Sequence, residues 1–275
     1  MFLILRIKYA DYSLLMNLHT AYTPNDPSGQ CLPSGRREQL PERCNVRKIG
    51  LIGGMSYEGS AVYYRELNRG INQRLGGLHS AQILLHSVDF QTIVEKQKAG
   101  EWAQAGSQLA EVARSLENAG ADCVMICAVT MHLVADAVMA ATSLPFIHIV
   151  DVVADRLKLA GHKKPLLIAT RYTMENGFYP ARMQNHGIDV LVPDSAGRSQ
   201  IHDIIFNELS LGIVRDESRA VLLSLIEQAK AEGADSVIFG CTEICLILES
   251  DKLALPGFDS TAIHIEAGID FALGS

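Results

Sequence analysis

The sequence predicts an α/β protein built as two pseudo-symmetric, Rossmann-like domains, each with a parallel β-sheet covered by helices. Three observations support this prediction. Short runs of β-branched and apolar residues alternate with helical stretches, this alternation continues from residue 48 to the end, and the second half of the chain repeats the first. Alternation of this kind is typical of parallel strands, because a helix returns the chain to the start of the next strand.

The elements follow from local pattern. Eight short apolar runs have the length and residue types of buried strands, at 48–52, 81–88, 122–128, 145–150, 164–170, 189–193, 235–240 and 255–259. Helical periodicity is found at 58–74, 102–119 and 219–232, and a shorter apolar helix is expected at 244–248.

An internal repeat predicts how these elements are organised. Residues 119–128 correspond to 232–241, an offset of 113 residues, and both segments place Gly-Ala-Asp before a buried strand. Lys48 corresponds to Lys164 at an offset of 116, and Leu144 corresponds to Leu255 at an offset of 111. Three matches in order indicate a duplication, the alternative being that any two α/β halves share such strand patterns. Two such domains would face each other with an active-site cleft between them, lined by the carboxyl ends of the strands.

The repeat also sets the expected domain limits. We expect residues 47–143 together with 255–275 to form the first domain and residues 144–254 to form the second. Residues 1–46 are expected to be a flexible N-terminal extension, either natural or the product of an upstream start, because 20–47 is rich in Pro, Ser, Gly and charge. The apolar stretch at 1–7 is too short and wrongly flanked for a good signal peptide.

Composition excludes several classes of protein. The chain of 275 residues has 48% hydrophobic residues, enough for one large or two modest cores, and no apolar run long enough to span a bilayer. Its net charge of -7 and the lack of long Lys/Arg clusters argue against a nucleic-acid partner. Six cysteines without CxxC spacing are too few for a disulfide scaffold, so we expect a cytoplasmic protein. The sequence shows no metal-binding motif, and no metal is expected.

The most informative strand end is Gly240-Cys241-Thr242-Glu243. A thiol beside a helix N-terminus is stabilised as the thiolate by the partial positive charge there, so Cys241 is a candidate nucleophile or acid/base. The alternative is a buried structural cysteine with Glu243 as a good partner for the helix dipole.

Two further strand ends are less specific. In the first half, Cys127 to His132 occupy the matching place, where Thr130 as a helix cap and His132 as a surface residue are sufficient structural explanations. The loop 53–56 has neither a dinucleotide-binding fingerprint nor a P-loop. Its glycines are expected to let a small ligand approach backbone N–H groups.

Taken together, six ordered motifs resemble the aspartate/glutamate racemase family over about residues 47 to 275. They are Gly53-Gly-Met-Ser-Tyr-Glu58, Leu78-His-Ser-Ala-Gln82, His86-Ser-Val-Asp-Phe90, 127–132, Thr170-Arg-Tyr-Thr-Met174 and 240–243. The resemblance implies a two-domain α/β protein, usually a homodimer, that inverts small acidic amino acids without pyridoxal phosphate or another cofactor. Inversion requires an acid/base on each face of the α-carbon.

The resemblance implies that Cys241 is one of these acid/base groups and that the other is missing. In the family pattern the first acid/base is the thiol of a Cys-Asn-Thr stretch, directly before the Asn. Similar sequences read Cys-Thr-Asn-Thr-Met-His, and alignment on Thr130-Met131-His132 places Val129 at the Asn and Ala128 at the acid/base position before it. The internal repeat agrees, because Cys241 pairs with Ala128. Adjacent strand residues point to opposite faces, so Cys127 is expected to point away from the cleft.

Three functions are therefore open. The first is a racemase in which Cys241 serves one face while Cys127, Thr130 or water serves the other. The second is a binding or regulatory relative that retains the cleft without turnover. The third is related superfamily chemistry, such as hydantoin racemisation, maleate isomerisation or decarboxylation.

The resemblance also implies a set of substrate contacts. They come from the Gly-rich loop, from a helix after 86–90 and from both strand ends, and Arg171 is a candidate clamp for a carboxylate. The set is Met55, Ser56, Gln97, Ala128, Val129, Thr130, Arg171, Thr242 and Glu243. Whether the substrate is aspartate or glutamate depends on one methylene of space, which the sequence leaves open.

Overall fold

The structure of the chain is a computed structural model that describes residues 46–274. Of the expected N-terminal extension, residues 1–45 lie outside the described residues, while Val46 is buried in the core.

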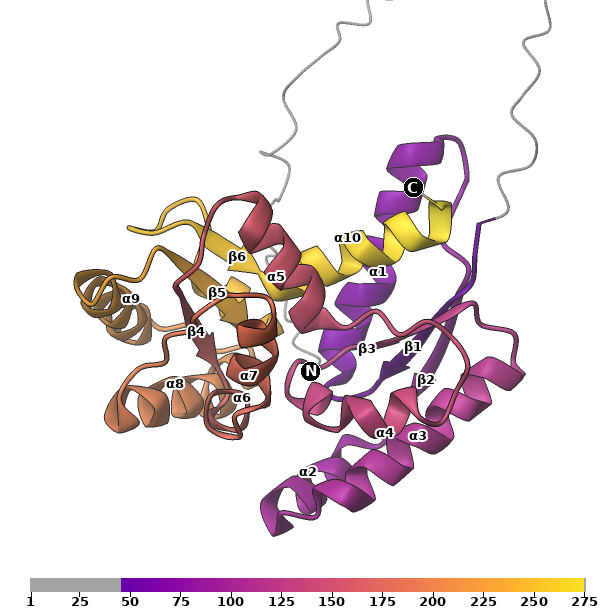
Figure 1. The fold of residues 1–275 in the computed structure, drawn as a ribbon, viewed down its shortest axis with the longest axis horizontal. Helices are drawn as coiled ribbons and strands as arrows, with labels where there is room; N and C mark the ends of the chain where they lie inside the picture. The colour runs from indigo at the N-terminus through magenta and orange to yellow at the C-terminus, as the bar shows by residue number, and fades with distance from the viewer. Residues whose placement is uncertain (1–45, 275) are drawn as a thin grey trace, which may run out of the picture. The chain divides into compact units, whose positions relative to one another are not determined.

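The first half of the described chain contains one three-stranded sheet with helices on both faces (Figure 1). Its elements are β1 (Ile49–Gly53), α1 (Tyr57–Leu75), β2 (Ile83–Ser87), α2 (Phe90–Ala99), α3 (Trp102–Asn118), β3 (Cys123–Ile126), the 3-10 turn η1 (Thr130–Val134) and α4 (Ala135–Met139).

The second half contains another three-stranded sheet. Its elements are α5 (Ile149–Leu159), β4 (Pro165–Ala169), α6 (Arg171–Glu175), α7 (Phe178–Asn185), α8 (Ser195–Asn207), η2 (Leu209–Leu211), α9 (Asp216–Ala231), β5 (Ser236–Gly240), η3 (Thr242–Leu246), β6 (Gly257–Asp259) and α10 (Ser260–Leu273).

All strand pairs in the two sheets are parallel, with the orders β2-β1-β3 and β4-β5-β6, which confirms the predicted α/β class. Strands β1, β3, β4 and β5 are buried at every residue, because helices cover both faces of each sheet. This burial explains why they read as continuous apolar runs rather than as alternating ones.

The repeated segments make the same contacts in both halves. The Asp122 carboxylate accepts the backbone N–H of Lys48 at 2.6 Å, and the Asp235 carboxylate accepts that of Lys164 at 2.9 Å. Two residues further along each strand, the Val124 N–H donates to the Pro145 carbonyl and the Val237 N–H donates to the Pro256 carbonyl, both at 2.9 Å. The repeated residues therefore form the same hydrogen bonds at the start of β1 and β3 in the first half and of β4 and β5 in the second.

Two predicted strands are shorter than expected. In 145–150, Phe146 forms only an isolated bridge to Val124, and in 189–193, Leu191 forms only a bridge to Leu166. The first of these runs is cut short because the His148 side chain accepts the Val150 N–H and caps α5. The helix expected at 244–248 is instead the short 3-10 turn η3.

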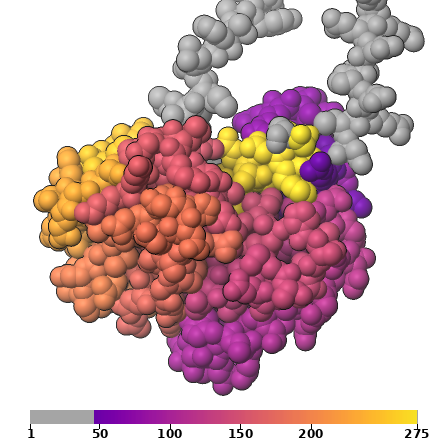
Figure 2. Space-filling view, in the orientation of Figure 1, coloured from indigo at the N-terminus to yellow at the C-terminus, as the bar shows by residue number. Residues whose placement is uncertain are grey.

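The segment 255–275 divides between the two sheets. Strand β6 pairs with β5 and so belongs to the second sheet, whereas the sequence placed it with the first domain. Helix α10 packs on both α5 and α1, and Figure 2 shows it on the surface between them. Among the described residues, no helix is long and apolar enough to cross a membrane.

Candidate functional site

The carboxyl end of β5 carries a thiol, a hydroxyl and a carboxylate in consecutive residues. The half-buried Cys241 Sγ donates to Glu243 Oε2 at 2.8 Å, and Thr242 Oγ1 donates to the same oxygen at 2.8 Å. The turn η3 begins at Thr242 and folds the Glu243 side chain back over Cys241. The thiol therefore has a proton acceptor within hydrogen-bond distance.

The electrostatics of this turn differ from the sequence-based expectation. Burial, together with the negative charge of Glu243, raises the pKa of the Cys241 thiol well above its usual value. The predicted stabilisation of the thiolate by a helix N-terminus is wrong, because η3 is a turn of five residues and a carboxylate lies beside the sulfur. The turn therefore favours the thiol form of Cys241.

On the first sheet, the Gly-rich loop leads into the N-terminus of α1. Ser56 caps this helix, because its Oγ accepts the Gly59 N–H at 3.2 Å. Gly54 has a φ of +89°, and a Cβ there would lie 2.2 Å from the Val88 carbonyl oxygen. This glycine is required for close packing against the end of β2, whereas the sequence analysis had assigned the glycines to ligand approach.

The two halves of the chain meet at Gly59. A Cβ on Gly59 would lie 3.5 Å from Thr242 Oγ1, 3.8 Å from Ser56 Oγ and 3.9 Å from the Cys127 carbonyl oxygen. The start of α1, the end of β3 and the turn η3 therefore converge on one point. The sequence-predicted residues Ser56 and Thr242 are brought together there, next to the Cys241 and Glu243 pair.

A cluster of three threonines joins the halves a second time. Thr130 Oγ1 lies 2.9 Å from Thr170 Oγ1 and 3.0 Å from Thr173 Oγ1, and the latter two are 3.1 Å apart. Thr170 also caps α6. The Thr130 hydroxyl, a candidate acid/base, is therefore already hydrogen-bonded to the second half.

The three residues before Thr130 have side chains in three different surroundings. Cys127 is buried in the core between β3, α1 and α10, as the alternation of strand faces predicts, and burial raises the pKa of its thiol. Val129 is buried in the core of the second half. Ala128 is half-buried, and its carbonyl oxygen lies 3.0 Å from His132 Nδ1.

Three other predicted contacts lie in different surroundings. Met55 is buried in the core beneath the first sheet, and the buried Gln97 places its Nε2 3.1 Å from Met131 Sδ. Arg171 is exposed at the start of α6, where its backbone N–H donates to His202 Nδ1 at 3.4 Å. Within the described chain, none of these three side chains is hydrogen-bonded to Cys241, Thr242 or Glu243.

Sequence reasoning missed a second thiol–carboxylate pair behind the first. Cys245 Sγ donates to Asp259 Oδ2 at 3.0 Å, and the other oxygen of Asp259 caps α10. Burial and the charge of Asp259 raise the pKa of Cys245 well above its usual value. Its spacing of four residues from Cys241 was the available signal.

It also missed a buried group of aromatic and imidazole rings. His264 Nε2 donates to the Ile147 carbonyl at 2.7 Å, so His264 Nδ1 must accept from the Tyr63 hydroxyl at 2.8 Å. His132 stacks edge-on against both His148 and His264. These residues are far apart in sequence, so no local pattern marks the group.

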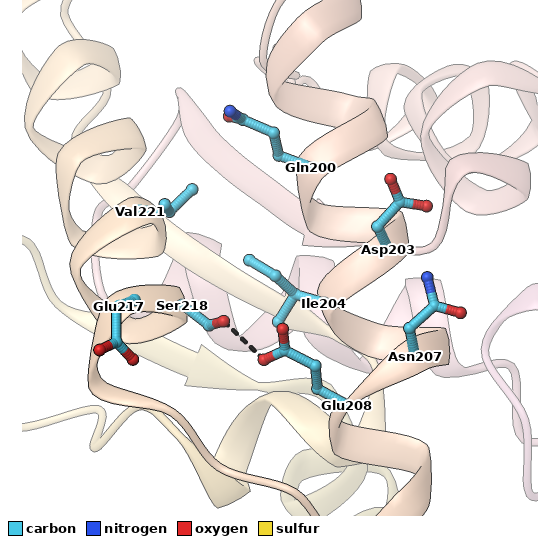
Figure 3. A pocket seen from close by; sticks show the side chains of 8 residues that line it. All are labelled: Gln200, Asp203, Ile204, Asn207, Glu208, Glu217, Ser218 and Val221. Atoms are coloured by element: carbon cyan, nitrogen blue, oxygen red, sulfur yellow. Dashed lines mark hydrogen bonds between the residues drawn. The ribbon is translucent and has the colours of Figure 1, made fainter.

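A separate groove of about 290 Å³ lies between α8 and α9 (Figure 3). It is lined by Gln200, Asp203, Ile204, Asn207, Glu208, Glu217, Ser218 and Val221. None of the sequence-predicted site residues lines it. Among the described residues, no group of three or more His, Cys, Asp or Glu side chains is placed to hold a metal ion.

Comparison with known proteins identifies the family. The model of the Asp/Glu/hydantoin racemase family matches residues 52–268. The chain belongs to the Asp/Glu/hydantoin racemase family. The resemblance read from the six motifs is thereby confirmed.

Individual members of the family are similar along most of the described chain. A crystal structure from Yersinia pestis, provisionally described as an Asp/Glu racemase, is 46% identical, with a TM-score of 0.79 over 82% of this chain and 99% of its own. An aspartate racemase homologue from Pyrococcus horikoshii is 29% identical, with a TM-score of 0.72 over the same shares of the two chains.

A further relative is similar over a smaller part of the chain. The broad specificity amino-acid racemase RacX of Bacillus subtilis is 25% identical over 153 residues, which are 54% of this chain and 63% of the relative. The match therefore spans less than two thirds of that protein.

Proposed function

We propose that this family member is a cofactor-independent racemase that moves a proton at the α-carbon of aspartate or glutamate, with Cys241 and Glu243 as its acid/base pair. The observation that carries the proposal is the 2.8 Å contact between Cys241 Sγ and Glu243 Oε2, next to the point where the halves meet. A carboxylate at that distance raises the pKa of the resting thiol, and it is also the group placed to accept the thiol proton at the moment of reaction.

The proposed reaction has two balanced steps. In the first, the Cys241 thiol proton passes to Glu243, and the thiolate removes the α-proton, which leaves a carbanion on the substrate. In the second step, the carbanion takes a proton from one of its two faces. If Cys241 gives the proton, the original configuration is restored, and Glu243 then returns its proton to the Cys241 thiolate. If a donor on the opposite face gives the proton, the configuration is inverted, Cys241 keeps the α-proton as its thiol, and Glu243 passes its proton through solvent to the conjugate base of that donor.

Substrate binding is proposed at the convergence of α1 and η3. The Ser56 hydroxyl and the N-terminus of α1 supply a hydrogen-bond donor and a partial positive charge, which suit a carboxylate, and Thr242 lies beside them. The exposed Arg171 side chain is a candidate for the second carboxylate. A homodimer in the cytoplasm remains part of this proposal.

The opposite face lacks a strong acid/base. Ala128 carries no ionisable group, the Cys127 thiol is turned into the core, and the Thr130 hydroxyl is bound to two other threonines. Water or Thr130 must then supply the inverting proton. Because a positioned acid/base contributes about 10²- to 10⁴-fold to rate, we expect α-proton exchange with solvent to be much faster than inversion.

Proton NMR in D₂O tests this proposal. Each enantiomer of aspartate and glutamate is incubated with the protein, loss of the α-proton signal gives the exchange rate, and chiral chromatography gives the inversion rate. The proposal predicts exchange faster than inversion for at least one substrate, and loss of both in Cys241→Ala. Exchange that survives this substitution would contradict the assignment of Cys241.

The structure also favours a second candidate function, a ligand-binding relative without turnover. Ala128 and the raised pKa of Cys241 are the observations in its favour. Absence of exchange for all four amino acids, together with thermal stabilisation by one of them, would support this alternative.

A further inference from the structure

The turn η3, which follows Cys241 and carries Glu243, is a short element. Cys241, its N-cap, makes no side-chain hydrogen bond to the backbone of this turn. The turn is closed by 3-10 contacts, from the Ile244 N–H to the Cys241 carbonyl at 3.2 Å and from the Ile247 N–H to the Ile244 carbonyl at 3.1 Å. Hydrogen bonds of this type have poor geometry, so the orientation of η3 depends on its contacts with other elements.

Contacts of two kinds hold the turn against the rest of the second half. The Ile244 side chain is fully buried in the core of that half. Arg219 of α9 donates through Nε to the Ile247 carbonyl at 2.9 Å, and Cys245 donates through Sγ to Asp259 Oδ2 at 3.0 Å. Apolar burial has no direction, so the two hydrogen bonds fix the rotation of the turn about its own axis.

Asp259 is itself firmly held. It ends β6, where it lies in register with Phe239 of β5, and its Oδ1 accepts the Thr261 N–H at 2.8 Å and the Ala262 N–H at 3.1 Å. Figure 1 shows β6 beside β5 and continuing into α10. Because β5 runs directly into Cys241, one pair of strands holds both the acid/base thiol and the carboxylate behind the turn.

We propose that Asp259 is a positioning residue for the Cys241 and Glu243 pair and that it acts through the Cys245 thiol. This inference rests on the proposed function and adds two residues that act through the turn rather than on the reacting atoms. The Asp259 carboxylate fixes the middle of η3, and the fixed turn holds Glu243 Oε2 at 2.8 Å from Cys241 Sγ. Displacement of a reacting group by about 1 Å can lower a rate by about 10²-fold.

A packing role for Cys245 would give a different pattern of effects. Cys245 also packs on the core of the second half. Burial and the charge of Asp259 raise the pKa of its thiol well above the usual value, so replacing Cys245 removes no charge at neutral pH. A change in the reactivity of Cys241 in a Cys245 variant therefore reports the position of Glu243. Serine at position 245 keeps a donor for Asp259 and should preserve that position.

Alkylation of Cys241 tests the proposal without any need for turnover. Iodoacetamide labelling over a range of pH, read by mass spectrometry of the peptide that carries Cys241, gives the midpoint of its reactivity. In Cys245→Ala and Asp259→Asn the midpoint should fall, because Glu243 no longer lies close enough to disfavour the thiolate. In Cys245→Ser it should stay at the value of the parent chain.

Exchange of the α-proton in D₂O gives the second readout. At saturating substrate it should fall by about 10-fold or more in Cys245→Ala and Asp259→Asn, while KM stays within about 3-fold of the parent value. Asp194→Asn is the matched control, because Asp194 also caps a helix of the second half, accepting the Gly197 N–H at 2.7 Å, and asparagine is an equally good cap. This control should change neither readout.

The two readouts distinguish failure of this proposal from failure of the proposed function. A parent chain without exchange, combined with a lowered midpoint in Cys245→Ala and Asp259→Asn, would contradict the racemase and support the positioning role. The positioning role is overturned by a midpoint that moves in neither or only one of these variants, by an equal shift in Asp194→Asn, or by a Cys245→Ser that behaves like Cys245→Ala. Circular dichroism and urea denaturation show that each variant is folded.

Discussion

At the residue scale, the proposed chemistry depends on one carboxylate oxygen that holds both a thiol and a hydroxyl. Replacing Glu243 with Gln removes a negative charge beside Cys241, so the pKa of the thiol should fall. The pH at which iodoacetamide alkylates Cys241 half-maximally should therefore move lower. Exchange at the α-carbon should nevertheless fall by about 10²-fold or more, because the amide cannot accept the thiol proton.

Two controls make this experiment specific. Cys241→Ala identifies the alkylation that belongs to Cys241 rather than to the other cysteines. Glu249→Gln removes an exposed carboxylate that pairs with Lys252, and it should change neither rate. An alkylation midpoint that stays constant or rises in Glu243→Gln would show that the carboxylate does not act on the thiol.

The missing partner at position 128 gives the second prediction at this scale. Ala128→Cys places a thiol at the start of the turn that the sequence repeat aligns with Cys241. We expect inversion to rise by about 10²-fold while exchange changes little, because an acid/base is added on one face alone. The ratio of inversion to exchange in D₂O measures this effect. A ratio equal to that of the parent chain would show that position 128 does not face the substrate.

Contacts within a local motif could be predicted from the sequence, whereas contacts between the two halves could not. Cys241, Thr242 and Glu243 are consecutive, so their mutual contact follows from a local motif. The contact of Thr130 with Thr170 joins different halves of the chain, and only the folded chain shows that a candidate acid/base is hydrogen-bonded there. The raised pKa of Cys241 was missed for the same reason, because burial is a property of the tertiary structure.

At the scale of elements, the Gly-rich loop is a packing device. Gly54→Ala would place a methyl group 2.2 Å from the Val88 carbonyl in a left-handed conformation, so we expect a loss of more than about 3 kcal/mol in the free energy of unfolding. Gly100→Ala, with a φ of +72°, a ψ of 15° and no atom within 4 Å of the new Cβ, should cost about 1 kcal/mol. Urea denaturation compares the two, and equal losses would contradict this role of Gly54.

Strands were easier to predict than the turns between them. Buried parallel strands read as apolar runs, which is why β1, β3, β4 and β5 were found from the sequence. The run at 145–150 has the same composition, but the His148 side chain caps a helix within it. Composition alone does not distinguish a strand from the start of a helix here, because the helix start depends on the single hydrogen bond from the Val150 N–H to the His148 side chain.

At the scale of the whole molecule, the internal repeat was the most informative feature of the sequence. It relates β1 to β4 and β3 to β5, and the aspartates of its Gly-Ala-Asp segments make the same hydrogen bond in both halves. Its match of Leu144 with Leu255 also has a counterpart in the structure, because Phe146 bridges to β3 and β6 pairs with β5 before α10 returns to α1. A repeat fixes the order of strands within a half, whereas the last helix is shared between the halves.

The buried histidines connect these halves and make stability dependent on pH. His264 binds Tyr63 of α1 and the Ile147 carbonyl, and His132 binds the Ala128 carbonyl and, more weakly, the Ile149 N–H. Burial lowers the pKa of His264 to about 4 and, together with the charge of Arg182, that of His148 to about 3. Burial and the neighbouring His148 and His264 also lower the pKa of His132 well below its usual value. His264 and His148 are therefore neutral in the folded protein at pH 5.

The unfolded chain behaves differently, because free histidine has a pKa of about 6.5. Below that pH the unfolded state binds protons that the folded state excludes, so stability present above about pH 6.5 is lost as the pH falls towards the folded values. His264 and His148 should each cost about 2 kcal/mol at pH 5. Urea denaturation at pH 7.5 and pH 5 measures the loss, and His264→Gln should reduce it. A free energy of unfolding that is constant over this range would show that the imidazoles bind protons in the folded core as readily as in the unfolded chain, and would contradict the prediction.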